Sequence, residues 1–482
     1  MKYDIIIIGA GLGGLTAGAK LAKEGKKVLV IEQHSQSGGC ATTFKRGDFN
    51  LEVGLHEMDG PSPRDIKTRI FNELEVFGNV EFVRVPEFYH FVSEHVKITI
   101  PHDPAAAMKV LREAFPSEIN GINAFFNQIL NPKRKIVGNK SSREQSLGEY
   151  LDSIIRTDDL KLVLLGNLGY FHDDPYSISL TYYSVAQGSY YSGGATFIKG
   201  GSQKLSDHLA DFIKKNKGNI VLNHLVTGIV TDNNKATGIT YKKKKGLSSE
   251  VITAYGEEII ANTAIPNVAE LLPYEYGIRL KEEIRKQKTG ASLLTIYLGF
   301  RNNLRDIGHN HYSTFVFDDS VKSQADILNN NTGEFNRRSF LFIDYGQIDS
   351  GLAPGSKSVG ALCCIDYLED WENLSPLEYR AKKEEVAKSF IGRLEKLIPG
   401  ISGEIEYYEV GTSATIKRYT LNPGGAVYGF AQLPGRPLID LSITPDNLHF
   451  ASAWGKTGGG FSGVIYSGYL CALNILRKKR TD

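Results

Sequence analysis

Three glycines and one acidic residue near the N-terminus form the most informative pattern in this sequence. Gly9, Gly11 and Gly14 follow one apolar run, and Glu32 follows a second. This order is typical of a strand, a glycine turn, a helix and a second strand that together bind a dinucleotide. Gly9 permits the tight turn, Gly11 admits the pyrophosphate, and Gly14 lets the helix pack close to the strand. The N–H groups at the start of the helix then face the phosphates.

The acid and the segment after it select among dinucleotides. The carboxylate of Glu32 can accept hydrogen bonds from a ribose 2′-hydroxyl and would repel a 2′-phosphate, which favours FAD or NAD over NADP. Gly38 and Gly39 follow within a short linker, and such a pair lets the chain pass beneath an extended FAD. The sequence therefore predicts FAD. Further expected contacts beside these glycines and Glu32 are Leu12, Gly13, Gln33, Cys40 and Ala41.

A second glycine-rich segment near the C-terminus has the same order of elements. A final strand over 447–454 enters a turn at 455–463, and a helix is expected from about 464 to 477. Such a turn offers N–H groups and a positive dipole end, here to the N1/C2 edge of the flavin. A packing role for the glycines is the alternative. The expected cofactor contacts are Gly455, Gly459, Gly460, Phe461, Ser462, Gly463 and Val464.

Composition limits the classes of protein. A chain of 482 residues is too long for one compact core, so two domains are expected. A net charge of +2 gives no support for nucleic-acid binding. The first strand begins almost at Met1, and no apolar run is long enough to span a bilayer. The four cysteines lack the spacing of a metal site, so no metal is expected, and reduced thiols in a cytoplasmic protein are the expectation.

Glycines are densest at 9–14, 193–201 and 455–468, which indicates a cofactor domain built from separated segments. We expect an α/β protein with a discontinuous Rossmann-like FAD-binding domain and an α+β substrate domain with a mixed sheet and helices. Val226 and Asn262, in later strands, are further expected FAD contacts. The expected FAD-binding segments are 1–60, 191–268 and 409–482, and the expected substrate-domain segments are 61–190 and 269–408.

The substrate domain has its own pattern of elements. Paired strands are predicted at 88–92 and 96–100, followed by mostly helical structure over 117–186. Longer apolar strands are predicted near 293–298 and 340–343. This mixture indicates a sheet covered by helices.

Taken together, these motifs resemble the phytoene desaturase, carotenoid isomerase and retinol saturase branch of the FAD-dependent, amine-oxidase-like flavoproteins. The resemblance covers essentially the whole chain. It rests on the first glycine motif, Glu32, Gly38-Gly39, and the segments 49–56, 193–205, 421–430 and 458–468.

The resemblance implies a long apolar substrate, such as a polyene, isoprenoid or retinoid-like chain. The expected reaction is desaturation or saturation of a carbon–carbon bond, with an unknown electron acceptor or donor. Non-redox cis–trans isomerisation of a carotenoid or polyene is the first alternative, and amine oxidation is the second. Any membrane contact is expected to be peripheral, through 117–186.

The segment from Gly54 to Glu57 is expected to lie at the flavin by the same resemblance, with Leu55 and His56 between them. His56 is a candidate acid, base or polariser of a substrate head group, and the alternative is a hydrogen-bonded structural histidine. Glu57 is a candidate base, or else a solvated loop carboxylate.

Two further residues are candidates for the flavin face. Tyr428 either lines that face or packs as a half-buried tyrosine. Lys456 either stabilises the anionic reduced flavin or is a surface lysine on the turn. We expect an apolar tunnel that ends against the flavin, walled by residues from 117–191 and 290–345.

Overall fold

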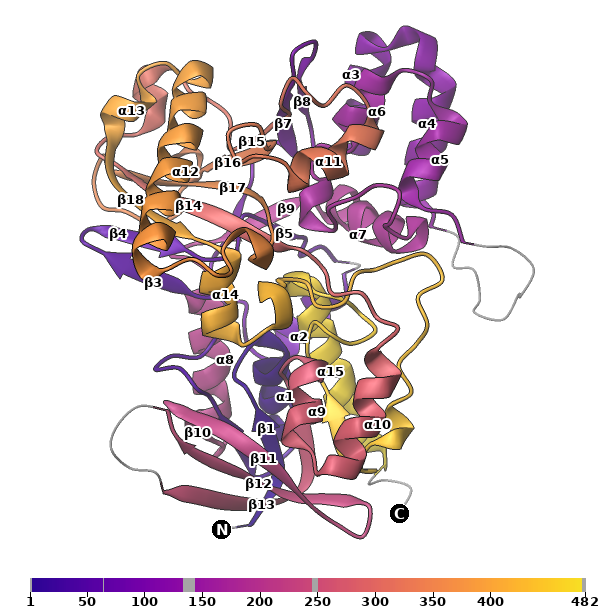
Figure 1. The fold of residues 1–482 in the computed structure, drawn as a ribbon, viewed down its shortest axis with the longest axis vertical. Helices are drawn as coiled ribbons and strands as arrows, with labels where there is room; N and C mark the ends of the chain where they lie inside the picture. Colours follow the sequence, from indigo (N-terminus) through magenta and orange to yellow (C-terminus); the bar gives the residue numbers. More distant parts are fainter. Residues whose placement is uncertain (1, 64, 133–143, 245–249, 479–482) are drawn as a thin grey trace.

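Two sheets organise the chain in a computed structural model that describes residues 2–63, 65–132, 144–244 and 250–478 (Figure 1). The first sheet, in the lower half of the figure, has the strand order β10-β2-β1-β13-β12-β11, with β19 paired to β13. Its strands are β1 (Lys2–Ile8), β2 (Val28–Ile31), β10 (Asn219–Val221), β11 (His224–Asp232), β12 (Lys235–Lys243), β13 (Val251–Ala261) and β19 (Leu448–Phe450).

The middle of the first sheet is parallel. β1 pairs in parallel with β2 and with β13, while β12 lies antiparallel between β13 and β11. Ile5, Ile6 and Ile7 have no exposed surface because the parallel part is covered on both faces. This arrangement confirms the Rossmann-like fold expected for the cofactor domain.

The second sheet is mixed and has the order β18-β14-β17-β16-β15-β7-β8. Only the pairing of β15 with β7 is parallel among the described strands of this sheet. The predicted strand pair of the substrate domain is present as β7 and β8. The strands are β7 (Tyr89–Val92), β8 (Lys97–Ile100), β14 (Ser292–Phe300), β15 (Ser313–Val316), β16 (Phe340–Asp344), β17 (Ser358–Asp366) and β18 (Ile405–Gly411).

Smaller sheets join these two. β3 pairs with β4 in a hairpin, and β9 lies between β5 and β6. These strands are β3 (Thr43–Arg46), β4 (Phe49–Glu52), β5 (Met58–Asp59), β6 (Phe82–Arg84) and β9 (Ala195–Ile198).

Helices cover both large sheets. Those beside the first sheet in Figure 1 are α1 (Leu12–Lys23), α2 (Ile66–Glu73), α8 (Gln203–Lys215), α9 (Ile265–Leu271), α10 (Tyr274–Ile284) and α15 (Gly460–Lys478). Those beside the second sheet are α3 (Pro104–Ala114), α4 (Ile119–Leu130), α5 (Leu147–Ile154), α6 (Asp158–Leu164), α7 (Leu180–Gly193), α11 (Ile327–Thr332), α12 (Pro376–Leu397), α13 (Ile401–Glu404) and α14 (Ser413–Thr420).

The start of α15 differs from the sequence expectation. The helix begins at Gly460 rather than near residue 464, so Phe461, Ser462 and Gly463 belong to its first turn. Consecutive glycines lower helix propensity, which is why the sequence alone favours a later start. No helix in the described part of the chain is long and apolar enough to cross a membrane.

The two helices from opposite ends of the chain, α1 and α15, pack backbone against backbone. A Cβ atom placed on Gly468 would lie 2.1 Å from the carbonyl oxygen of Gly13. One placed on Gly13 would lie 1.9 Å from the carbonyl oxygen of Ala451, which directly follows β19 and is not part of α15. Real Cβ atoms do not approach so closely, so only glycine fits at both positions. This contact brings the N-terminal and C-terminal glycine turns to the same side of the first sheet.

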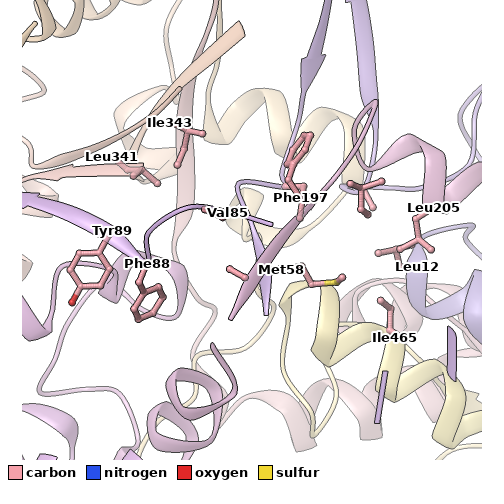
Figure 2. Packing of buried hydrophobic residues seen from close by; sticks show 14 of the residues in the cluster. Leu12, Met58, Val85, Phe88, Tyr89, Phe197, Leu205, Leu341, Ile343 and Ile465 are labelled. Carbon is pink, nitrogen blue, oxygen red and sulfur yellow. The ribbon is translucent and has the colours of Figure 1, made fainter. Parts of the chain in front are cut away.

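One apolar core runs through both sheets. Leu12, Leu205 and Ile465 from the cofactor-side helices belong to the same cluster as Leu341 and Ile343 of β16. Figure 2 shows other members of the cluster between these two groups. The two sheets are therefore packed as one body, although the exact domain boundaries stay a prediction.

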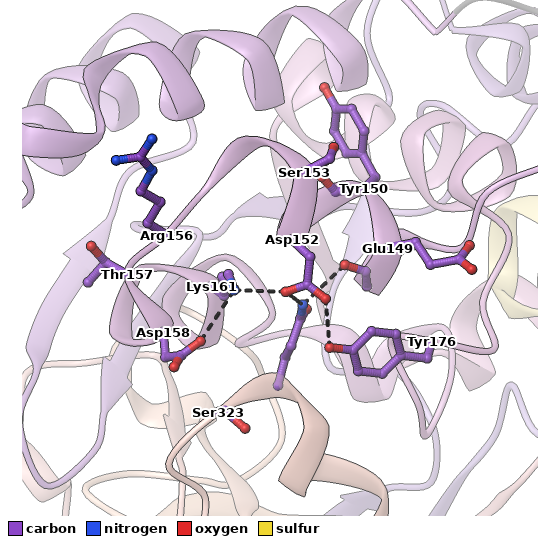
Figure 3. Close-up of polar contacts among 12 residues, drawn as sticks. Glu149, Tyr150, Asp152, Ser153, Arg156, Thr157, Asp158, Lys161, Tyr176 and Ser323 are labelled. Atoms are coloured by element: carbon purple, nitrogen blue, oxygen red, sulfur yellow. Dashed lines mark hydrogen bonds and ion pairs between the residues drawn. The ribbon is translucent and has the colours of Figure 1, made fainter.

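A polar network joins the helices of the substrate side to the segment between β15 and β16 (Figure 3). Asp152 of α5 accepts hydrogen bonds from Lys161 at 2.8 Å and from Tyr176 at 2.9 Å. Gln324, which precedes α11, donates to the same carboxylate at 2.7 Å. Asp152 thereby ties α5, α6 and the 324–332 segment together as one wall.

We expect Gly468→Ala to lower the free energy of unfolding by about 1–3 kcal/mol, because the added methyl group must push α1 away from α15. The flavin content of the purified protein should fall as well. Thermal unfolding and the visible spectrum measure the two effects.

Gly392→Ala is the matched control, because Gly392 lies in α12 with no atom within 4 Å of its Cβ position. That change should leave the flavin content unaltered and raise stability by up to about 1 kcal/mol. If the two variants behave alike, the backbone contact is not what constrains α15.

Candidate functional site

A cavity of about 1460 Å³ lies between the two sheets and is lined by residues of both. One part of its wall comes from the two glycine turns and from Glu32. Another part is mostly apolar or aromatic and comes from both ranges expected to wall the tunnel. This second part includes Leu165, Tyr170, Tyr190, Leu293, Phe315 and Leu341.

The carboxylate of Glu32 holds the first glycine turn in shape. Its two oxygens accept hydrogen bonds from the N–H of Ala10 at 2.8 Å and from the N–H of His34 at 2.9 Å. Asn262, at the end of β13, donates to the carbonyl oxygen of Gly9 at 3.1 Å. These side chains satisfy backbone groups of the turn and thereby help to hold its shape.

Two helices begin at the cavity wall. The residue before α1 is Gly11, which has no side chain to cap the helix, and Leu12 lines the cavity. Phe461 in the first turn of α15 lines it as well. A Cβ atom on Gly39 would lie 3.3 Å from the Cα of Gly11, so the chain crosses the turn closely. The uncapped start of α1, the glycine-rich start of α15 and the bare backbone between them fit the pyrophosphate and ring edge of FAD.

Glu52 joins the segment after β4 to the start of α8. The carboxyl group is buried and accepts hydrogen bonds from the N–H of Gly54 at 3.1 Å and of Leu55 at 2.9 Å. It also accepts from the N–H of Ser202 at 2.8 Å and from its hydroxyl at 2.7 Å. Burial raises the pKa of Glu52 to about 7, while the four donors favour the ionised form.

Tyrosines from the substrate side hold the next three carbonyl groups. The hydroxyl group of Tyr345 donates to the carbonyl oxygen of Leu55 at 3.0 Å. Those of Tyr312 and Tyr190 donate to the carbonyl oxygens of His56 and, at 3.5 Å, of Glu57. Together with Glu52, these contacts fix the backbone of residues 54–57 from both sides. The loop therefore presents its side chains in a defined direction.

Burial shifts both titratable side chains of this loop towards their neutral forms. Glu57 is 7% exposed, and its two oxygens have no hydrogen-bond partner among the described residues. Burial, and then the nearby Glu87, raise the pKa of Glu57 well above its ordinary value. Burial lowers the pKa of His56 to about 4. The ring of His56 contacts that of Tyr170, with their centroids 5.8 Å apart.

Most of the candidate residues line this one cavity. Lys456 is exposed and is not among the lining residues, which does not support its expected place at the flavin. Gly14, Leu55 and Gly455 also lie outside the lining. The candidates in the lining are Gly9, Gly11, Leu12, Gly13, Glu32, Gln33, Gly38, Gly39, Cys40, Ala41, Gly54, His56, Glu57, Val226, Asn262, Tyr428, Gly459, Gly460, Phe461, Ser462, Gly463 and Val464.

The sequence analysis did not identify two residues of the site, Glu52 and Tyr170. Glu52 is the last residue of the short strand β4, and no feature of the sequence separates it from a surface acid. Tyr170 lies in a helical segment in which many tyrosines occur, and only its position opposite His56 singles it out. In both cases the signal is a contact between segments far apart in the chain.

Comparisons with known proteins agree with this geometry. The family model of flavin containing amine oxidoreductases matches residues 12–476. A prolycopene isomerase of Arabidopsis thaliana is 27% identical, over 98% of this chain and 82% of the relative. An all-trans-retinol 13,14-reductase of Danio rerio is 24% identical, over 98% of this chain and 86% of the relative.

Solved structures share the fold. An oxidoreductase from Methanosarcina mazei has a TM-score of 0.69 at 18% identity, covering 99% of this chain and 100% of that protein. A putrescine oxidase bound to putrescine has a TM-score of 0.66 at 16% identity, covering 99% of each chain. The matched family and the fit of the two glycine turns identify FAD as the cofactor.

We expect Glu32→Ala to weaken FAD binding at least about tenfold, because it removes the acceptor of two backbone N–H groups and the expected partner of the ribose. Titration of the apoprotein with FAD, followed by flavin fluorescence, gives the affinity. Glu32→Gln keeps one acceptor oxygen, so its affinity for FAD should lie between those of the wild-type protein and Glu32→Ala. Equal affinity in all three proteins would contradict this role of Glu32.

Proposed function

Because the chain belongs to the family of flavin-containing amine oxidoreductases, we propose that it forms or removes a carbon–carbon double bond in a long apolar substrate. The substrate is of the polyene, isoprenoid or retinoid-like class. The observation that carries this proposal is the large cavity that continues from the dinucleotide turn into an apolar, aromatic-lined space. Two relatives that match nearly the whole chain are named for a carotenoid and for a retinoid.

The residues of the cavity have separate tasks in this reaction. The two glycine turns and Glu32 hold the cofactor, and bound FAD supplies hydride exchange at carbon. Leu165, Leu293 and Leu341 line the cavity, where they exclude water from the reacting bond. They also give an extended substrate chain apolar contacts along its length.

Cis–trans isomerisation of a polyene is the second candidate. It is favoured by the similarity to prolycopene isomerases, which extends over 98% of this chain. The same cavity serves both reactions, since each requires a polyene beside the flavin. The mass of the product separates the two, because isomerisation leaves the mass of the substrate unchanged.

The deciding experiment is an anaerobic single turnover of the flavin-loaded protein with a panel of polyenes. Oxidised and chemically reduced protein are tested separately, and products are analysed by chromatography and mass spectrometry. A gain or loss of two hydrogens, matched by a change in the flavin spectrum, supports the proposed redox reaction. A product of unchanged mass favours the isomerase. Absence of both, with turnover of an alkyl amine, would reject both candidates.

We expect Ala186→Trp to lower polyene turnover at least about tenfold, because Ala186 of α7 lines the cavity and an indole ring would occupy the space of the chain. The flavin content should stay unchanged. Ala105→Trp on the exposed side of α3 is the control and should keep full turnover. Unimpaired turnover in Ala186→Trp would place the substrate elsewhere.

A further inference from the structure

Two unpaired polar groups stand in the apolar part of the cavity. Neither oxygen of the Glu57 carboxyl group has a hydrogen-bond partner among the described residues, and the same holds for the hydroxyl group of Tyr170. Both residues line the cavity. His56 lies beside them, with its ring against that of Tyr170.

Four surrounding tyrosines do not serve as partners, because their hydroxyl groups already donate to backbone carbonyl groups. Tyr190 and Tyr312 donate to backbone carbonyl groups of the loop that carries Glu57. Tyr89 and Tyr183 donate to the carbonyl groups of Val163 and Leu164, at 2.9 and 3.1 Å. The hydroxyl groups of these four tyrosines are thus satisfied, whereas the Glu57 carboxyl group and the Tyr170 hydroxyl group have no partner among the described residues.

Two buried polar groups without partners lower the stability of the folded protein unless a ligand forms hydrogen bonds with them. Buried polar groups are nearly always hydrogen-bonded, and an unpaired one weakens the folded state. Elsewhere in this molecule buried charges are paired: Arg338 donates to the carbonyl oxygen of Gly333 and to Asp370, both at 2.8 Å. An open pair that lines the cavity therefore indicates a site for a ligand atom.

We propose that Glu57 and Tyr170 together bind an oxygen atom, of a carbonyl or a hydroxyl group, carried by the otherwise apolar substrate. This inference rests on the proposed function and narrows its substrate class. Among long apolar chains it selects those with an oxygen function over pure hydrocarbons.

The chemistry of the two groups supports a neutral oxygen ligand. A carboxylic acid has one O–H donor and one acceptor oxygen, and a tyrosine hydroxyl group can donate or accept. Burial and the nearby Glu87 favour the protonated form of Glu57. A carbonyl oxygen would then accept from both residues, whereas a hydroxyl group would accept from Tyr170 and donate to Glu57. A hydrocarbon would leave both groups without a partner.

The test compares ligands of one carbon skeleton. All-trans-retinol, all-trans-retinal, the hydrocarbon that lacks their oxygen, and retinylamine are titrated into the oxidised, flavin-loaded protein. Binding is followed by the change in the flavin spectrum. The wild-type protein should bind the alcohol or the aldehyde at least about tenfold more tightly than the hydrocarbon.

Variants then assign the preference to the two residues. Tyr170→Phe and Glu57→Leu should bind the oxygenated ligands and the hydrocarbon with similar affinity. Glu57→Gln should keep most of the preference, because a carboxamide still donates and accepts. Tyr297→Phe is the control, since Tyr297 lines the same cavity from β14. Flavin content and thermal unfolding verify that each variant is folded.

The outcomes separate this inference from the proposed function. If the wild-type protein binds the alcohol, the aldehyde and the hydrocarbon equally, the oxygen site is wrong while the apolar substrate stands. If it binds only retinylamine, and Glu57→Gln abolishes that binding, Glu57 is an ionised partner of a cation and both proposals fail. A preference that survives in Tyr170→Phe and Glu57→Leu would also overturn the oxygen site.

Discussion

The contact between α1 and α15 is the constraint on which the rest of the structure depends. At Gly13 and Gly468 the two helices meet with no side chain between them. Because the helices come from opposite ends of the chain, this contact places two helix N-termini at one cavity. One start is expected to face the pyrophosphate, and the other is expected to face the ring edge of the flavin.

The loop at residues 54–57 couples the cofactor side to the substrate side. Glu52 fixes its start to α8, and tyrosine hydroxyl groups beside the second sheet fix its carbonyl groups. The loop belongs to neither large sheet, and its backbone conformation depends on contacts from the side of each. Its geometry is therefore sensitive to the relative position of the two sheets, which the continuous apolar core keeps constant. Precise placement of a hydride donor and acceptor requires such rigidity.

The cavity combines an apolar wall with a few polar groups that have no partner. This contrast is informative because the protein pairs its other buried charges: Asp366, which has no exposed surface, accepts hydrogen bonds from Trp371 and from Ser413. The Asp366 carboxylate is thus satisfied within the chain, whereas some buried polar groups have no hydrogen-bond partner among the described residues. Those left open at Glu57 and Tyr170 line the space where a substrate would lie, as expected for a site that discriminates among ligands.

Local patterns in the sequence determined the cofactor half of this protein. The Gly9–Gly14 turn, Glu32 and the alternation of strand and helix are local signals, because a tight turn and a helix start depend on residues close together in the chain. Tertiary structure alone decided that Lys456 is exposed, that α15 begins at Gly460, and that Tyr170 lies against His56. These depend on packing between distant segments, for which one sequence carries no local signal.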